Sequence, residues 1–168
     1  MFAALAKIIL KSRIEKENNS RKKRFLSWDA IQKMALLIEH DPKLNKSQID
    51  RFVQESGKYV EVFYIETTSE LSSFGDWHCF TRKETGFLKL PKQNSLVELK
   101  GKKFDLLINT CNSHNLFAIA LSSSIEATLK LGTASKFSES DMIISKNEGL
   151  GLLAYLKVVD SYLKMIKV

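Results

Sequence analysis

The chain has 168 residues, of which 44% are apolar and 27% charged, an ordinary composition for one soluble globular domain. Seven glycines and two prolines are too few for a collagen-like or low-complexity chain. The two cysteines, Cys79 and Cys111, lie far apart and form no metal-ligand spacing with the three histidines. We therefore predict neither a metal site nor a disulfide framework.

The sequence also contains no membrane-spanning or secretory signal. No stretch approaches the roughly 18 to 20 apolar residues that cross a bilayer. Residues 1–10 are largely apolar, but Lys7 interrupts them and basic residues follow the run instead of preceding it, which is the wrong order for a signal peptide. Widely spaced thiols fit a reducing compartment, so we expect a cytoplasmic protein.

Most of the net charge of +7 lies near the N-terminus, since residues 1–24 contain eight basic and two acidic groups. We predict a basic amphipathic arm over residues 1–27 and a single α/β domain over residues 28–168, whose core begins near Met34. The basic groups that we expect to contact an anionic partner are Lys7, Lys11, Arg13, Lys16, Arg21, Lys22, Lys23 and Arg24.

The arm is predicted to be helical. Phe2, Leu5, Ile8 and Ile9 recur at helical spacing and form its expected apolar face. Residues 18–20 then supply a polar break before the basic cluster. The sequence leaves open whether this helix is free or packs on its own domain.

The next elements alternate between strands and helices. Residues 34–38 form a continuous apolar run, which is typical of a strand buried on both faces. Ser47, with Asp50 three positions later, is the expected cap of a helix that Gly57 ends. Residues 60–65 predict a second strand, and residues 77–81 predict a weaker third.

The second half repeats the pattern. Residues 104–108 are almost entirely apolar and are expected at the centre of the sheet. Asn115 is expected to start a helix that runs through Ala127, and strands are expected at 128–133 and 142–144. The final helix is predicted by an apolar stripe formed by Leu152, Leu156, Val159, Leu163 and Ile166.

This alternation predicts an α/β fold with a Rossmann-like, mostly parallel sheet of five or six strands. Helices are expected on both faces, and a basic N-terminal helix is expected to precede them. Ligands bind such sheets beyond the carboxyl ends of the strands. The residues at those ends that form our candidate pocket are His40, Thr67, Asn109, Ser113 and His114.

The polar loop, residues 109–115, has a polar or thiol group at every position and precedes a predicted helix. It is either part of a small pocket or a solvated loop that caps the helix. The first strand-to-helix connection, residues 40–45, lacks glycine, and Gly149-Leu150-Gly151 is a lone GxG. Nucleotide binding by the standard glycine-rich turn is therefore disfavoured, and we predict no cofactor.

No third residue completes a catalytic set with a histidine, so no catalytic residue is predicted. We expect a binding module whose arm contacts RNA or the ribosome. A membrane surface or an acidic protein is an alternative partner for the arm. A further alternative is a small enzyme or ligand sensor that uses the polar loop.

Almost the whole chain resembles a family of small bacterial Rossmann-like domains of unknown function. This resemblance implies the fold and the compartment and brings no activity. The segments that carry it are residues 21–25, 30–31, 80–83, 90–92, 104–109, 130–132, 141–144 and 162–166.

A shorter resemblance concerns the N-terminal half of heptosyltransferase-type glycosyltransferases. Residues 104–109, 116–127 and 130–132 are similar to a strand-helix-strand piece of that half. The chain has no counterpart of the donor-binding half, so we do not expect an independent transferase.

Overall fold

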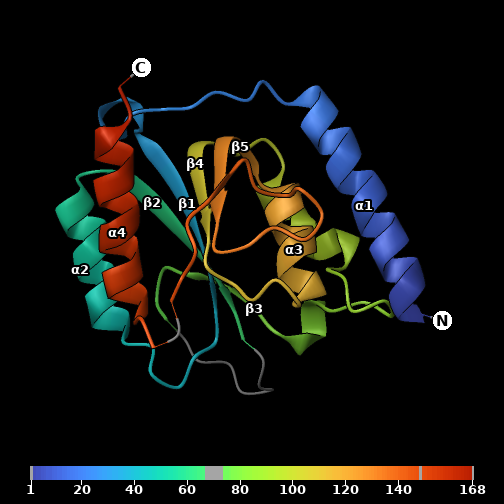
Figure 1. Ribbon diagram of the computed structural model, residues 1–168. Coiled ribbons are helices and arrows are strands. Elements are labelled where there is room, and N and C mark those ends of the chain that lie inside the picture. The colour runs from blue at the N-terminus through green and yellow to red at the C-terminus, as the bar shows by residue number, and fades with distance from the viewer. Residues whose placement is uncertain (1, 67–73, 148, 168) are drawn as a thin grey trace.

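A single parallel sheet occupies the centre of the molecule (Figure 1). The structure is a computed structural model and describes residues 2–66, 74–147 and 149–167. Within those residues the sheet has six strands in the order β3-β2-β1-β4-β5-β6. The strands are β1 Lys33–Glu39, β2 Tyr59–Ile65, β3 His78–Phe80, β4 Lys103–Asn109, β5 Glu126–Gly132 and β6 Met142–Ile143.

The predicted α/β architecture is confirmed. Every neighbouring pair of strands is parallel, and β4 lies between β1 and β5 as its apolar sequence predicts. The central strand β1 is buried on both faces because its side chains alternate between two apolar clusters. Met34, Leu36 and Ile38 pack on one face, while Ala35 and Leu37 pack on the other.

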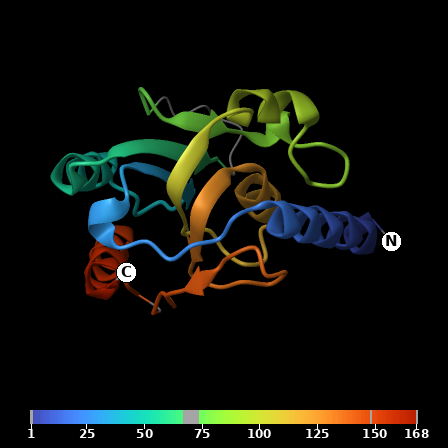
Figure 2. The ribbon, with the colours of Figure 1, turned by 90° about the horizontal axis from the view of Figure 1, so that it is seen from above.

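Helices cover both faces of the sheet. The helices are α1 Phe2–Ser20, α2 Lys46–Ser56, α3 Leu116–Ser124 and α4 Leu152–Met165. Helices α2 and α4 cover one face, and α3 covers the other together with the short 3-10 helix Gln93–Leu99 (Figures 1 and 2). Two further 3-10 turns, Trp28–Ala30 and Arg82–Glu84, lie between the larger elements.

Two helix boundaries differ from the prediction. Asn45, rather than Ser47, caps α2, because its side-chain oxygen accepts the Ser47 backbone N–H. Asp50 does not complete a capping box, and its carboxylate accepts a hydrogen bond from the Lys46 side chain. Gly57 ends the helix in a left-handed conformation with φ 65°, as predicted. Helix α3 stops three residues short of Ala127 because β5 already begins there.

Helix α1 forms an additional layer over α3, on the side away from the sheet (Figure 2). Leu10 and Ile14 are fully buried against Ile119 and Ala120 of α3. Because α3 is covered on both sides, every residue from 117 to 123 is buried. The expectation that the core begins near Met34 is therefore wrong, while the boundary at residue 28 stays a prediction.

The predicted apolar face of α1 is also wrong. Ala6, Leu10 and Ile14, spaced by four residues, form the buried stripe. Leu5 is 48% exposed and Ile8 is 66% exposed on the opposite side of the helix. The first turns of α1 therefore have two apolar stripes. The stripe of Ala6, Leu10 and Ile14 is the one that is buried, because it continues along the whole contact with α3.

Candidate functional site

The strand order places a crevice between β1 and β4. From β1 the chain moves outward through β2 to β3, then returns to β4 on the other side and moves outward again to β6. The connections that follow β1 and β4 therefore leave the sheet on opposite faces, toward α2 and α3. In open parallel sheets, ligands bind at the carboxyl ends of the two strands where this reversal occurs.

A cavity of about 900 Å³ lies at this point and is called the carboxyl-edge cavity below. It is formed by the segments that follow four strands: His40 to Asn45 after β1, Thr110 to Ser113 after β4, Thr133 and Ala134 after β5, and Ser145 to Asn147 after β6. The start of α4, at Gly151 to Ala154, closes it on one side. Its size falls within the range of small-molecule sites.

The charged lining of the cavity mixes signs. Among the residues that the structure describes, Lys43 and Lys146 are the lysines that line it, and Glu39 and Asp41 are the acids. Glu39 is already used, because its two oxygens accept the Asn112 backbone N–H and the Asn115 side-chain amide. Asp41 accepts the Lys43 backbone N–H. The two acids thus hold the loops after β4 and β1 in place by hydrogen bonds. Neither lysine has an ion pair among the described contacts.

Most of the polar loop, residues 109–115, is used to hold its own shape. Asn109 accepts the Cys111 backbone N–H, Asn112 accepts that of His114, and Asn115 caps α3 by accepting that of Ala118. The cap alternative is therefore correct for Asn115.

Two other side chains of this loop differ in what they offer a ligand. The Cys111 thiol is buried, and burial raises its pKa well above the ordinary value, with the Glu39 carboxylate as a second cause. It is thus a poor nucleophile. Ser113 remains on the cavity wall.

Two buried side chains contact His40, namely Tyr64 of β2 and Glu66, which directly follows β2. Its Nδ1 lies 2.7 Å from the Tyr64 hydroxyl and 3.3 Å from Glu66 Oε1, and the Tyr64 hydroxyl donates to Glu66 Oε2 at 3.2 Å. Burial, with the Glu66 charge in addition, raises the pKa of Tyr64 far above its ordinary value. These contacts to Nδ1 fix the orientation of the His40 ring.

The predicted pocket residues do not all meet. His40 and Ser113 line the carboxyl-edge cavity, and Asn109 is buried behind the loop. His114 lines a second cavity, formed by Glu66, Arg82, Phe87 and the start of α1. Thr67 lies outside the described residues. The predicted pocket lacks three lining residues, Lys43, Thr133 and Lys146. Thr133 was predictable as the end of a strand, but nothing in the local sequence shows that three distant loops converge.

Comparison with protein families gives one finding. A family of unknown function, DUF6913, matches residues 4–166, almost the entire chain. The chain belongs to this family. The comparisons with curated proteins and with solved structures gave no match.

The family carries no described activity, so the chemistry of this member rests on its own residues. Among the described residues, no group of three or more His, Cys, Asp or Glu side chains is placed to hold a metal ion. No helix in the same residues is both long and apolar enough to cross a membrane.

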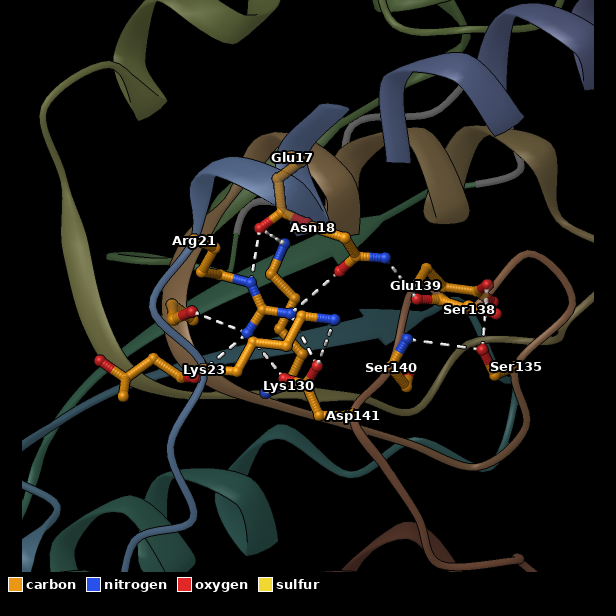
Figure 3. A network of polar contacts seen from close by, with 12 residues as sticks. Glu17, Asn18, Arg21, Lys23, Lys130, Ser135, Ser138, Glu139, Ser140 and Asp141 are labelled. Carbon is orange, nitrogen blue, oxygen red and sulfur yellow. Dashed lines mark hydrogen bonds and ion pairs between the residues drawn. The ribbon is translucent and has the colours of Figure 1, made fainter. Parts of the chain in front are cut away.

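The structure divides the basic groups of the second predicted site, the arm, into a buried and an exposed set. Figure 3 shows the buried set around Arg21. Arg21 was expected to face a partner, but its guanidinium lies inside the molecule and is only 5% exposed. It binds Asp141 through two nitrogens, at 2.6 and 2.8 Å, and donates to the carbonyls of Ala127 and Thr128. Nothing of its charge is left for an outside partner.

Arg21 belongs to a buried group that we call the charge clamp, made of Glu17, Arg21, Lys130 and Asp141. Glu17 Oε1 lies 2.8 Å from Arg21 Nε and 3.1 Å from Lys130 Nζ. Burial lowers the pKa of Lys130 to about 8, although Glu17 opposes the shift. Burial is the largest single influence on Asp141 and opposes its charge. The hydrogen bonds from Arg21, the Lys130 backbone N–H and Lys23, together with the positive charge of Arg21, outweigh burial and lower that pKa.

The remaining basic groups of the arm face outward. Lys23 reaches Asp141 at 3.3 Å from a position that is 42% exposed, and Arg13 is half-buried. Lys11 lies 4.0 Å from Glu15, which is a weak surface pair. The other exposed basic side chains are Lys7, Lys16, Lys22 and Arg24.

Proposed function

We propose that the chain is a binding domain for a small polar molecule with a negatively charged group, held in the carboxyl-edge cavity. The observation that carries this proposal is the position of a cavity of about 900 Å³ at the reversal point of a parallel sheet. Lys43 and Lys146 line it and supply the attraction for a negative group.

The ligand differs from a dinucleotide bound in the usual way. In dinucleotide-binding folds, the pyrophosphate occupies the N-terminus of the first helix after a glycine-rich turn. Here the Asn45 side chain occupies that position on α2, where it accepts from both the N–H and the hydroxyl of Ser47. The opening of α4 is different, since Gly151 precedes it without a side-chain cap. The negative group therefore fits the Lys146 side of the cavity best.

The expectation that the arm contacts RNA or the ribosome stays a prediction, with a reduced set of residues. Arg21 is occupied in the charge clamp and Lys23 is shared with it. The proposal of a small-ligand site is supported by a formed cavity, whereas the arm has separate exposed charges. For this reason we favour ligand binding in the cavity over RNA binding by the arm.

A thermal-shift screen tests the proposal, with inorganic phosphate, nucleoside monophosphates and sugar phosphates as probes. A ligand at about one hundred times its Kd stabilises the folded state by about 2.7 kcal/mol, which is several degrees in Tm for a chain of this size. We expect Ser113→Phe to fill the cavity and to abolish the shift. His114→Phe places the same phenyl ring in the same loop, on the wall of the other cavity, and is the control.

Two results would overturn the proposal. One is the absence of any shift across the three probe classes. The other is a shift that Ser113→Phe and Lys146→Ala leave unchanged while both variants stay folded by circular dichroism, because the probe then binds elsewhere.

A further inference from the structure

The outer face of α1 combines apolar and basic side chains in an ordered way. Because successive helical residues turn by about 100°, Leu5 and Ile8 fall on the side opposite the buried stripe. Both are large apolar residues that stay 48% and 66% exposed. Lys7 and Lys11 flank this strip on one side, and Lys16 flanks it on the other. A narrow apolar strip between lysines is the pattern of helices that lie in a lipid interface.

A rigid turn beside α1 adds an aromatic anchor. The Gly86 N–H donates to the Leu90 carbonyl at 2.7 Å, and the Lys89 N–H donates to the Gly86 carbonyl at 3.0 Å. This closes a tight turn, and Phe87 at its tip is 81% exposed, the largest exposure among the large apolar side chains of the described residues. The turn is a fixed feature, since Leu90 is buried in the same cluster as Leu10 of α1.

The turn and the helix form one surface. Leu88 also packs against the cluster that contains Leu10 and Ile14, and Phe87 and Ala3 line the same cavity. In both ribbon views the loop that contains Phe87 lies beside the N-terminal end of α1 (Figures 1 and 2). Leu5, Ile8 and Phe87 are called the apolar anchors below.

The charge around the anchors is strongly positive. Residues 2–16 and 82–92 together contain eight basic and two acidic side chains. The two acids have partners, since Glu15 lies near Lys11 and Glu84 accepts hydrogen bonds from Thr81. An occupant of this surface must therefore offer negative charge and an apolar layer together.

From this combination we infer that the surface formed by α1 and the turn at Phe87 docks on an anionic lipid bilayer. The lysines contact lipid head groups, and the apolar anchors enter the acyl boundary. A nucleic acid would use the lysines but has no layer for Leu5, Ile8 and Phe87, so the observations favour the membrane. The inference is independent of the ligand proposed for the carboxyl-edge cavity.

Co-sedimentation with vesicles tests the inference. The full chain is mixed with vesicles of phosphatidylcholine alone, or of phosphatidylcholine with phosphatidylglycerol. We expect binding to the anionic vesicles. Ile8→Asp and Phe87→Ser should each lower the affinity by about tenfold or more, because each removes one apolar side chain that is transferred from water into the lipid on binding. Lys7→Ala and Lys16→Ala should each cost about fivefold.

Met165→Asp is the matched control. Met165, at the end of α4, is 65% exposed, almost the same as Ile8. Helix α4 lies on the far side of the molecule from α1 (Figure 1). We expect this variant to bind vesicles like the unaltered chain. Phe87→Trp supplies a direct readout, since its fluorescence should shift to the blue with anionic vesicles only, while Trp28 and Trp77 are already buried.

Three outcomes would overturn the inference. Vesicle binding that Ile8→Asp and Phe87→Ser leave intact would show that the apolar anchors do not enter lipid. Failure to bind anionic vesicles, together with lysine-dependent binding to RNA, would assign the surface to nucleic acid. Self-association in sedimentation equilibrium that Ile8→Asp abolishes, without vesicle binding, would make a second copy of this chain the occupant.

Discussion

The N-terminal 24 residues contain two basic regions whose charges do different work. In residues 17–24 the central cation, Arg21, is buried, meets a carboxylate through two nitrogens and caps strand carbonyls. In residues 2–16 the lysines are exposed and surround apolar side chains. The same net charge, from four basic groups and one acid in each region, thus corresponds to a packing device in one region and a binding surface in the other. Solvent exposure and the partner of each charge make the difference.

The largest expected effect tests the buried region. Arg21→Ala leaves Asp141 and Glu17 buried with fewer partners, and breaking a buried ion pair from one side costs about 3–5 kcal/mol. We expect a loss of this size in urea unfolding. Arg24→Ala removes an exposed basic side chain three residues later and should cost less than about 0.5 kcal/mol. Equal effects for the two variants would mean that burial does not set Arg21 apart from the exposed cations.

A second test compares the two apolar stripes of α1. Leu10 is fully buried against α3 and Leu5 is 48% exposed. Leu10→Ala should therefore cost about 2–4 kcal/mol of unfolding free energy, because it leaves a cavity. Leu5→Ala should change the stability by less than about 0.5 kcal/mol. If Leu5→Ala is the more damaging variant, the buried stripe has been assigned to the wrong face.

The two stripes also show how much of the structure could be predicted from the sequence alone. The strands and their parallel arrangement were predictable because buried strands are continuous apolar runs. The packing of α1 had a signal that was missed: residues 116–121 are apolar all round, so α3 needs cover on both sides. Lys130, a lone charge within a buried strand, likewise required a buried partner.

The partners themselves had no local signal. Asp141 meets Arg21 across 120 positions, and Lys146 reaches the cavity only because β6 lies beside β5. Such convergence is set by strand order, which depends on long-range pairing. The predicted pocket residues are divided between two cavities for a similar reason. Ser113 lines the carboxyl-edge cavity, while the next residue, His114, lines the second cavity.

An acid titration gives a smaller effect that is specific to the clamp. Arg21 lowers the pKa of Asp141 below its ordinary value of 3.8. A carboxylate with a lowered pKa contributes stability above the unfolded value, and this contribution is lost as the pH falls through the folded value. Unfolding free energies measured from neutral pH to about pH 3 should therefore fall less steeply for Asp141→Asn than for the unaltered chain. Identical slopes would contradict this assignment.

The smallest effect is expected in the exposed region. Lys7→Ala combined with Lys16→Ala should change the unfolding free energy by less than about 0.5 kcal/mol, because isolated surface charges contribute little. The same double variant should lower the dependence of vesicle binding on salt concentration. A large loss of stability here would mean that these lysines are structural, as Arg21 is.

The distance along the chain between α1 and its partners has a consequence for synthesis. Helix α1 is made before its partners. Its Leu10 and Ile14 pack on Ile119 and Ala120 of α3, and Arg21, just after the helix, binds Asp141, so each partner is made more than one hundred residues later. A growing chain emerges from the ribosome from its N-terminus. Throughout most of translation, Leu10, Ile14 and Arg21 are therefore without the surfaces that bury them in the finished fold. During that period α1 presents both of its apolar stripes, and transiently exposed apolar surface of this kind is what chaperones bind.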